Sequence, residues 1–205
     1  MLLFYHNYEV KLLKKYIVGI TGASGSIYGV RLVEELVKQG NEVHLVVTDN
    51  GRKVLEYEIE VNFEEWIYSV KEYKGNLIVC DIDDMFSSIA SGSFRTDGMV
   101  IVPCSMGTLS KISCGVTDNL LIRAADVMIK EKRNLILVPR ETPFSSIHLK
   151  NMLLLSDLNV TILPPMPAFY QKPKTIEELV NITVGRILSS LKIDSDLYDE
   201  WGGNK

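Results

Sequence analysis

The sequence predicts an α/β protein with a Rossmann-like (flavodoxin-like) doubly wound parallel sheet in three layers, α/β/α. Two observations lead to this prediction: short runs that are almost wholly apolar, and longer amphipathic stretches that alternate with them. Short apolar runs rich in β-branched residues are typical of strands buried on both faces of a parallel sheet. Alternation of such strands with helices, joined by right-handed crossovers, places helices on both faces of the sheet.

Five runs have the character of buried strands, and a sixth is a weaker candidate. The five are residues 16–20, 42–47, 99–103, 134–138 and 159–163, and the sixth is residues 76–80. Three stretches between the runs have helical periodicity with recognisable ends, such as Gly40 after the first and a Thr175–Glu178 capping-box pattern in the third. These predicted helices are residues 26–39, 120–130 and 175–191.

Composition and charge exclude several classes of protein. At 205 residues and 23.1 kDa we expect one domain, residues 15–205, after an N-terminal extension, residues 1–14. A net charge of -4 and a pI near 5.5 argue against a nucleic acid or an anionic membrane as the main partner. No apolar run approaches the roughly 20 residues of a bilayer span, and polar residues interrupt the start of the chain where a signal peptide would be apolar. We therefore expect a cytoplasmic protein.

The cysteines and histidines give no sign of a metal or nucleophile site. Cys80, Cys104 and Cys114 are odd in number and lack CxxC spacing, which argues against zinc and against a disulfide framework. We predict that each cysteine is a small buried hydrophobe. His44 lies within a predicted strand, and no cluster of His, Asp and Glu has the spacing of metal ligands. The sequence therefore predicts no metal.

The loop after the first predicted strand, residues 19–29, runs through small residues into a helix. Its backbone N–H groups and the helix N-terminus should face an incoming anion, unless it is a tight turn without a ligand. The dinucleotide pattern G-x-G-x-x-G is not satisfied, and Ser26 and Tyr28 break the short-chain dehydrogenase pattern. Tyr170 and Lys174 fit the Tyr-x-x-x-Lys spacing of that class, but Pro173 between them excludes the helix that the spacing requires.

Other polar segments follow predicted strands, at the sheet edge where α/β proteins bind ligands. Hydroxyl groups in residues 104–108 suit a phosphate or a heterocycle edge, although an ordinary helix cap explains them equally well. Arg123 and Lys130 are two helical turns apart and share one face, which for Lys130 is also compatible with a solvated surface. Arg140 and Glu141 end another strand, where an arginine suits bidentate phosphate contact.

Four segments together resemble the UbiX-type flavin prenyltransferases, formerly described as phenylacrylic acid or 3-octaprenyl-4-hydroxybenzoate decarboxylases. The segments are IVGITGASGSIYGVRL, SGSFRTDGMVIVPCSMGTLS, DNLLIRAADVMIKEKRNLILVPRETP and ILPPMPAFYQKP. The resemblance covers about residues 15–201, and its most specific part is RAADV-x-x-K-E-x-R followed by VPRETP.

The resemblance implies an activity and an assembly. It implies a flavoprotein that is a homo-oligomer, typically a homododecamer, with its sites at subunit contacts. Reduced FMN would be the substrate, and dimethylallyl phosphate would alkylate it without a metal. The dimethylallyl group would become bonded to N5 and C6 of the flavin. The product, prenylated FMN, would serve a UbiD-type decarboxylase in ubiquinone biosynthesis or aromatic acid decarboxylation.

The resemblance also implies roles for individual residues. Flavin contacts are implied, with the FMN phosphate near the first three, for Gly22, Ala23, Ser24, Thr48 (often Ser in relatives), Ser105, Met106, Gly107, Thr108, Arg123 and Arg140. Binding of the allylic phosphate is implied for Lys130, Arg140, Glu141, Tyr170 and Arg186, in a pocket also lined by Ser91, Gly92 and Ser93. Catalytic roles extend to Glu58, near the reacting edge, and to Trp201, whose π face could stabilise a developing allylic cation. Glu141 could move a proton, unless the departing phosphate acts as the base.

Other functions remain open from the sequence. An FMN-dependent decarboxylase of cysteine-containing peptides or of phosphopantothenoylcysteine would share the sheet. It would need a His after the first helix and an asparagine-bearing loop in place of residues 103–108. A flavin chaperone or carrier would have no use for four of the side chains, namely Arg140, Glu141, Tyr170 and Arg186. A nicotinamide dehydrogenase fails on the glycine pattern.

Overall fold

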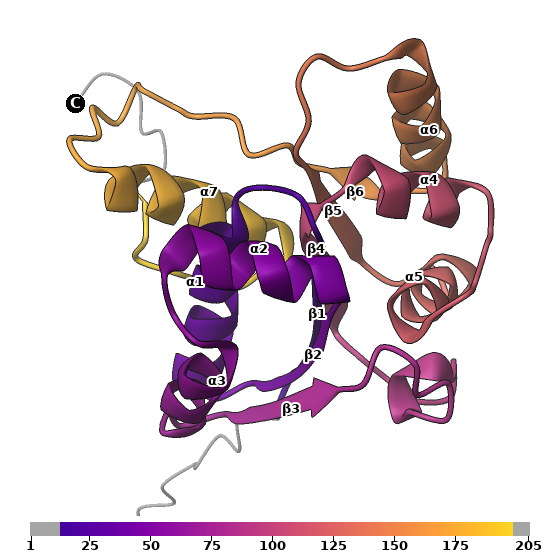
Figure 1. Cartoon of the computed structure of the whole chain (residues 1–205), viewed down its shortest axis with the longest axis horizontal. Coiled ribbons are helices and arrows are strands. Elements are labelled where there is room, and N and C mark those ends of the chain that lie inside the picture. The colour runs from indigo at the N-terminus through magenta and orange to yellow at the C-terminus, as the bar shows by residue number, and fades with distance from the viewer. Residues whose placement is uncertain (1–12, 199–205) are drawn as a thin grey trace, which may run out of the picture.

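The computed structural model describes residues 13–198, which form a six-stranded parallel sheet with helices on both faces (Figure 1). The strand order is β3-β2-β1-β4-β5-β6, so the chain reverses direction across the sheet between β1 and β4. This is the order of a doubly wound α/β fold, and it confirms the predicted fold class. The strands are β1 Lys15–Ile20, β2 Glu42–Val47, β3 Asn76–Cys80, β4 Gly98–Cys104, β5 Leu135–Pro139 and β6 Thr161–Ile162.

Between residues 13 and 198, seven α-helices and one short 3-10 helix precede, follow or connect the strands. They are α1 Ser26–Lys38, α2 Asp49–Ile59, α3 Phe63–Lys71, η1 Ser88–Ala90, α4 Met106–Ser113, α5 Leu120–Lys130, α6 Ser146–Asp157 and α7 Ile176–Ser190. The predicted helices correspond to α1, α5 and α7 within two residues at each end. All six predicted strands are present, but β6 is limited to two residues because Pro164 and Pro165 follow soon after and cannot extend a ladder.

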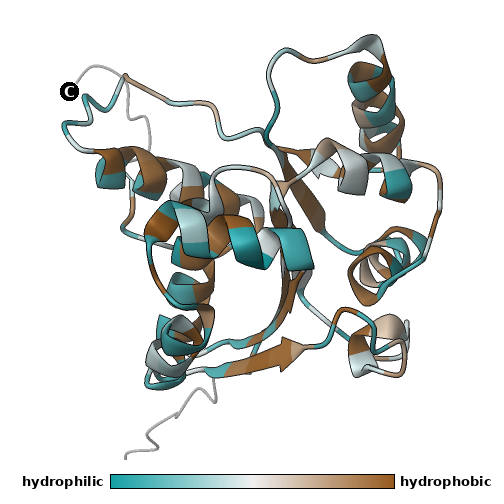
Figure 2. Cartoon of the chain, viewed as in Figure 1, coloured by the Kyte–Doolittle hydropathy of each residue, from teal (hydrophilic) through white to brown (hydrophobic). Residues whose placement is uncertain are grey.

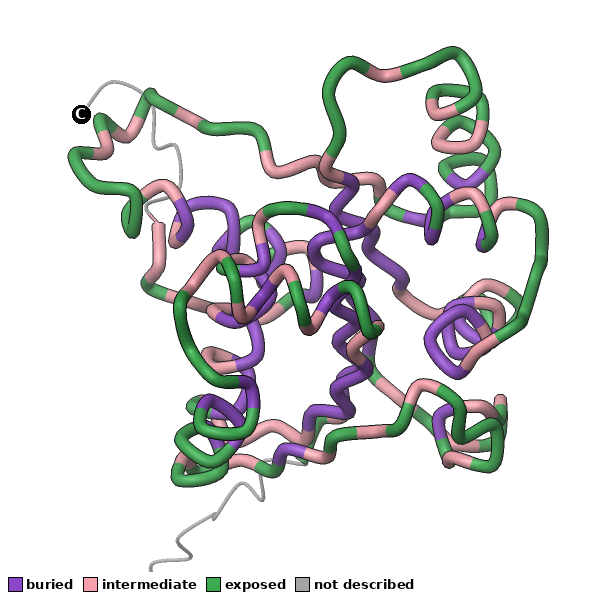
Figure 3. Tube along the Cα trace, in the orientation of Figure 1, coloured by how far each residue is buried: buried purple, intermediate pink, exposed green. Residues whose placement is uncertain are grey.

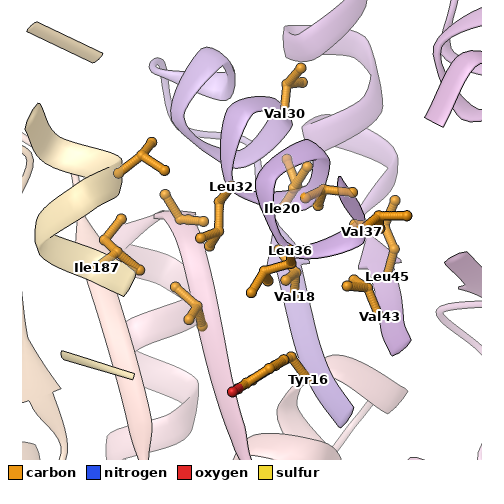
Figure 4. Packing of buried hydrophobic residues seen from close by; sticks show 14 of the residues in the cluster. Tyr16, Val18, Ile20, Val30, Leu32, Leu36, Val37, Val43, Leu45 and Ile187 are labelled. Atoms are coloured by element: carbon orange, nitrogen blue, oxygen red, sulfur yellow. The ribbon is translucent and has the colours of Figure 1, made fainter. Parts of the chain in front are cut away.

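The core lies in two layers, one on each face of the sheet. Alternate residues of β1 divide between them: Val18 and Ile20 face α1, α2, α3 and α7, whereas Ile17 faces α4, α5 and α6. Figure 4 shows Val18 and Ile20 below α1, with Leu36 beside them. Burying a side chain such as Leu36 contributes about 1.5–3 kcal/mol, so each layer is held mainly by its apolar contacts.

Glycine allows α5 to approach the sheet closely. A Cβ on Gly19 in β1 would collide with the end of the Leu121 side chain, so a larger residue fits here only if that side chain moves. The start of α5 is therefore held close to the carboxyl end of β1, where the loops that follow the strands meet.

The structure also bears on the expectations about membrane-spanning segments, cysteine burial and the N-terminal extension. None of the helices between residues 13 and 198 combines the length and the apolar character that a bilayer span requires.

Cys104 is buried, and burial raises the pKa of its thiol to about 12. Cys80 is half-buried and Cys114 is exposed, so the prediction of a buried thiol was wrong for Cys114. The extension at residues 1–14 lies almost wholly outside the described residues, so that boundary and the single domain stay predictions.

Candidate functional site

A pocket of about 570 Å³ lies at the carboxyl ends of the first four strands, and we call it the edge pocket. Its position spans the point where the strand order reverses, which is where doubly wound sheets bind ligands. Its wall includes these residues that sequence analysis assigned to flavin: Gly22, Thr48, Ser105, Gly107 and Thr108. Its size is within the usual range of small-molecule sites, about 300–1,000 Å³.

Three helices begin at the edge pocket, each with a side-chain cap. The Thr48 hydroxyl accepts from the Gly51 N–H at 3.0 Å at the start of α2, and Asn119 caps α5 in the same way. The Ser105 hydroxyl accepts from the Thr108 N–H at 3.2 Å at the start of α4. A Cβ on Gly107 would have no neighbour closer than 4.0 Å, so this turn of α4 is open. Helix N-termini carry partial positive charge, so the first turns of these helices favour an anionic group such as a phosphate, although the carboxylates of Asp49, Asp83 and Asp118 also line the pocket.

Thr21 joins the loops that follow β1 and β4. Its hydroxyl donates to the Pro103 carbonyl and accepts from the Ser105 N–H, both at 2.8 Å. No role was predicted for Thr21, which the structure buries directly after β1. A polar residue at the end of an apolar run is the sequence signal that could have marked it. Gly22 comes next, and a Cβ there would lie 2.7 Å from the Cβ of Asn50. The loop after β1 therefore packs directly on the first turn of α2.

Glu58 of α2 occupies the N-terminus of α1. Its Oε2 accepts from the N–H groups of Gly25 and Ser26, each at 2.9 Å. Burial raises the pKa of this carboxyl, but hydrogen bonds from the Ser24 hydroxyl and from the N–H groups of Ser26 and Gly25 outweigh burial and hold the pKa below its usual value. The amide groups that sequence analysis offered to an incoming anion are thus already bonded to a carboxylate of the chain.

Arg140 lies beside Ser24 at the same edge of the sheet. Its Nε donates to the Ser24 carbonyl at 3.1 Å, and its backbone N–H donates to the Cys104 carbonyl at 3.2 Å. The next side chain, Glu141, is exposed and accepts from the Thr142 N–H at 2.9 Å. The structure therefore brings Ser24, Glu58 and Arg140 together.

A second pocket, of about 610 Å³, lies between α7 and the segment that follows β6, and we call it the α7 pocket. Its wall is mostly apolar: Leu163, Pro164, Met166, Ala168 and Ile182. Tyr170, Thr183 and Arg186 supply its polar groups. Tyr170 and Arg186 therefore line the same pocket, and both are among the five residues predicted to bind the allylic phosphate.

The helix α7, which forms one wall of the α7 pocket, makes two polar contacts with α1. The Arg31 Nε donates to the Asn181 Oδ1 at 2.9 Å. Burial raises the pKa of the Tyr28 hydroxyl, and a hydrogen bond with Thr183 partly offsets this rise. Thr183 had no role in the sequence analysis, because nothing in the sequence marks a buried threonine of α7 as a pocket residue.

A further group extends along α5 from its first turns to its far end, and we call it the α5 cluster: Ser91, Gly92, Ser93, Arg123, Lys130, Glu131 and Arg133. Arg123 donates from Nε to the Ala90 carbonyl at 3.1 Å, and Lys130 pairs with Glu131 at 2.8 Å. The 11 residues of α5 put its two ends about 15 Å apart. Residues Leu121 and Ile122 at its start line the edge pocket, so Lys130 lies well away from that pocket within one chain.

The predicted site residues that the structure describes therefore fall into four groups in one chain: the edge pocket, the start of α1 with Glu58 and Arg140, the α7 pocket and the α5 cluster. Met106 and Ala23 are buried, so they can contribute mainly backbone groups to a ligand. Trp201 lies outside the described residues. Between residues 13 and 198, no group of three or more His, Cys, Asp or Glu side chains is arranged to hold a metal ion.

Comparisons with known proteins give consistent matches along the chain. A family model described as Flavoprotein matches residues 5–188. The flavin prenyltransferase UbiX of Halalkalibacterium halodurans is 50% identical over 191 residues, covering 91% of this chain and 93% of the relative. The enzyme of the same name from Methanocaldococcus jannaschii is 47% identical over 188 residues, covering 92% and 98%.

Solved structures agree with these relatives. AnUbiX (PadA1), in complex with FMN and dimethylallyl pyrophosphate, is 40% identical with a TM-score of 0.88, covering 94% of this chain and 100% of the other. A dodecameric FMN-dependent UbiX-like decarboxylase from Escherichia coli O157:H7 is 42% identical with a TM-score of 0.85, covering 92% and 100%. The peptidyl-cysteine decarboxylase EpiD is 18% identical with a TM-score of 0.60, which shows a shared fold alone.

Proposed function

This chain belongs to the UbiX flavin prenyltransferases within the flavoproteins, and we propose that it joins the dimethylallyl group of dimethylallyl phosphate to N5 and C6 of reduced FMN. The observation that carries the proposal is the pair of pockets. One is lined by hydroxyls and helix N-termini, and the other is apolar with an arginine and a tyrosine. A flavin with its phosphate suits the first pocket, and an allylic phosphate suits the second.

The edge pocket would hold FMN. The open first turn of α4, at Gly107, offers N–H groups to the flavin phosphate, and the capping hydroxyls of Thr48 and Ser105 lie around it. Glu58 takes the N–H groups of Gly25 and Ser26, which favours the α4 turn over the α1 turn as the phosphate position. Reduced FMN supplies the two nucleophilic atoms of the reaction.

Cations and a tyrosine would stabilise the leaving phosphate. Phosphate is a modest leaving group, so charge that develops on it as the allylic C–O bond breaks must be stabilised by preorganised donors. Arg140, Tyr170, Arg186 and Lys130 are the donors that we assign to it. Holding the allyl group over the flavin adds the orientation effect. Glu141, exposed beside Arg140, would move a proton, with the departing phosphate as the alternative base.

The distance between Lys130 and the edge pocket supports a site that copies of the chain share. Lys130 would then reach the allylic phosphate from a neighbouring subunit. The surface of α6 also supports an oligomer, because α6 carries several hydrophobic residues among polar ones in Figure 2 and is mostly exposed in Figure 3. Ile147 is 65% exposed and Leu153 is 64% exposed, whereas Leu155 is buried. Exposed apolar faces of this kind mark protein interfaces, and we propose a homododecamer.

The decisive test is the product. Protein incubated anaerobically with FMN, a reductant and dimethylallyl phosphate should yield a flavin heavier by one C5 prenyl unit, as measured by mass spectrometry. Unchanged FMN in the presence of folded protein would rule out the prenyltransferase function and favour a flavin carrier. Release of CO₂ from a cysteine-containing peptide would instead favour the decarboxylase.

Two substitutions test the division of roles at the site. Glu141→Gln and Arg140→Ala should each retain yellow FMN while turnover stops, because both side chains are assigned to the allylic phosphate. Loss of flavin from both variants would mean that the phosphate position is wrong. We further propose that the product serves a UbiD-type decarboxylase in the cytoplasm. Such an enzyme produced without prenylated FMN should gain activity when the reaction mixture is added.

A further inference from the structure

Two charged residues of the α5 cluster, Glu131 and Arg133, have no part in the proposed function so far. Both belong to the motif that begins at Arg123. Lys132 between them has a φ of 54°, in the left-handed region, so the chain turns sharply as α5 ends. The Arg133 N–H then donates to the Met128 carbonyl at 2.9 Å. This turn directs the Arg133 side chain back toward the loop that precedes β4.

The Arg133 guanidinium bridges two carbonyl groups of that loop. Its Nη1 donates to the Phe94 carbonyl at 2.7 Å, and its Nη2 donates to the Gly92 carbonyl at 2.5 Å. The Arg133 side chain is only 18% exposed. A guanidinium presents several N–H groups in a fixed plane, whereas a lysine ammonium is a point charge and cannot reproduce this double contact. The geometry of residues 91–94 therefore depends on this arginine.

Lys130 and Glu131 lie directly against the same loop. A Cβ on Gly92 would collide with the Glu131 Oε1 and would lie 2.9 Å from the Lys130 Nζ. The Glu131 Oε1 accepts from Lys130 at 2.8 Å, and its Oε2 is 4.0 Å from the Arg133 Nη2. The Lys130 ammonium is thus held above Gly92 by a carboxylate that also faces Arg133.

The hydroxyls on either side of Gly92 complete the arrangement. The Ser91 and Ser93 hydroxyls are 2.9 Å apart and hydrogen-bonded to each other. Both residues are exposed, so an anion from solvent can reach them. One ammonium and two hydroxyls are therefore presented together, and their relative positions are set by the contacts of Arg133 and Glu131.

We propose that Arg133 and Glu131 are positioning residues of the prenyltransferase. Arg133 fixes the loop of Ser91 and Ser93, and Glu131 fixes Lys130 above it, so that the three donors meet the allylic phosphate together. This inference rests on the proposed function, because it takes the phosphate of that substrate as the ligand of the three donors.

The test compares Arg133→Lys with Arg95→Lys, an identical exchange at an exposed arginine of the same loop. Hydrogen exchange without any ligand should become several-fold faster for residues 88–96 in Arg133→Lys and stay at the wild-type rate in Arg95→Lys. The KM for dimethylallyl phosphate should rise about 10-fold in Arg133→Lys, with kcat changed by less than about 3-fold and FMN affinity unchanged. Arg95→Lys should keep the wild-type KM.

Each outcome bears on one of the two proposals. Unchanged exchange, or faster exchange with an unchanged KM, would overturn the positioning role alone. A wild-type protein that forms no prenylated FMN would overturn the proposed function and, with it, the assigned ligand. Should Arg133→Lys not fold, Gly92→Ala tests the same arrangement, because its methyl group must displace Glu131 and Lys130 while Arg133 stays in place. It too should raise the KM and leave FMN affinity unchanged.

Discussion

The edge pocket and the α7 pocket are similar in volume, about 570 and 610 Å³, but different in chemistry and in construction. The edge pocket is assembled from the turns after parallel strands, so helix N-termini and capping hydroxyls surround it. The α7 pocket is assembled from a proline-rich segment and one helix, so apolar side chains dominate its wall. One fold thus presents a pocket whose lining suits a polar phosphate ester and a second pocket whose lining suits an apolar chain with one charged end. If this difference holds, substitutions in one pocket should affect one ligand and leave the other bound.

The largest expected effect is a loss of affinity for dimethylallyl phosphate at the α7 pocket. Arg186→Met removes its guanidinium, and loss of a charge-assisted hydrogen bond should weaken binding of dimethylallyl phosphate by roughly 10- to 100-fold. The affinity for FMN, measured by fluorescence titration, should stay within about 2-fold. Lys174→Met, at an exposed cation outside the pocket wall, is the matched control. Equal losses of both ligands would mean that the two pockets are not separate sites.

The next effect is steric and concerns the edge pocket. Gly22→Ala places a methyl group 2.7 Å from the Asn50 Cβ, and overpacking of this kind costs about 1–3 kcal/mol. Thermal unfolding without flavin should therefore occur several degrees lower, and FMN should bind about 10-fold more weakly. Gly107→Ala, where the added methyl group has no neighbour closer than 4.0 Å, should not lower the unfolding temperature. A drop in both variants would contradict the steric explanation.

A smaller, pH-dependent effect is expected at Glu58. Glu58→Gln should lower stability by about 1 kcal/mol, the size typical of a helix N-cap, or by about 2–4 °C in unfolding temperature. Because the folded-state pKa of Glu58 lies below its unfolded value, this stabilisation is complete above the unfolded pKa and is lost as the pH falls through the folded one. The difference from wild type should be largest at neutral pH and should disappear in acid. Glu60→Gln, at the exposed end of the same helix, should show no such difference.

The smallest effect is expected at Thr48. Thr48→Ala removes the hydrogen bond to the Gly51 N–H and should destabilise the protein by about 1 kcal/mol or less. Thr48→Ser keeps the hydroxyl and should restore most of that loss in chemical unfolding. Equal destabilisation by serine and alanine would show that the methyl group of Thr48, rather than its cap, supports the edge pocket.

The fold was predictable wherever the apolar pattern was strong. The strands are short apolar runs, and α1, α5 and α7 each bury a full face. The prediction did not include α2, α3, α4 or α6. Of these, α2 buries just Gly51 and Leu55 among its described residues, and α6 turns most of its apolar side chains outward. The helices α3 and α4 bury apolar residues but are 9 and 8 residues long, which leaves little helical periodicity to detect. A helix whose apolar residues face another molecule has no inward stripe for a sequence pattern to reveal.

The candidate site was predictable in composition but less so in arrangement. Parallel strands end at one edge, so the meeting of Ser24 with Arg140 followed from the fold class. The bonds from Glu58 to the start of α1 depend on how α2 packs on α1, which the sequence does not specify. The separation of Lys130 from the edge pocket could have been anticipated, since a helix that leads into the next strand must end at the opposite edge of the sheet.

The carboxylate at the start of α1 has a consequence for turnover. In the proposed reaction the flavin is a substrate, so the prenylated product must leave the protein after every cycle. Had the N–H groups of Gly25 and Ser26 depended on the flavin phosphate, they would lose their partner each time the product departed. Glu58 satisfies these groups from within the chain, so the loop can keep its shape through release and receive the next flavin without refolding.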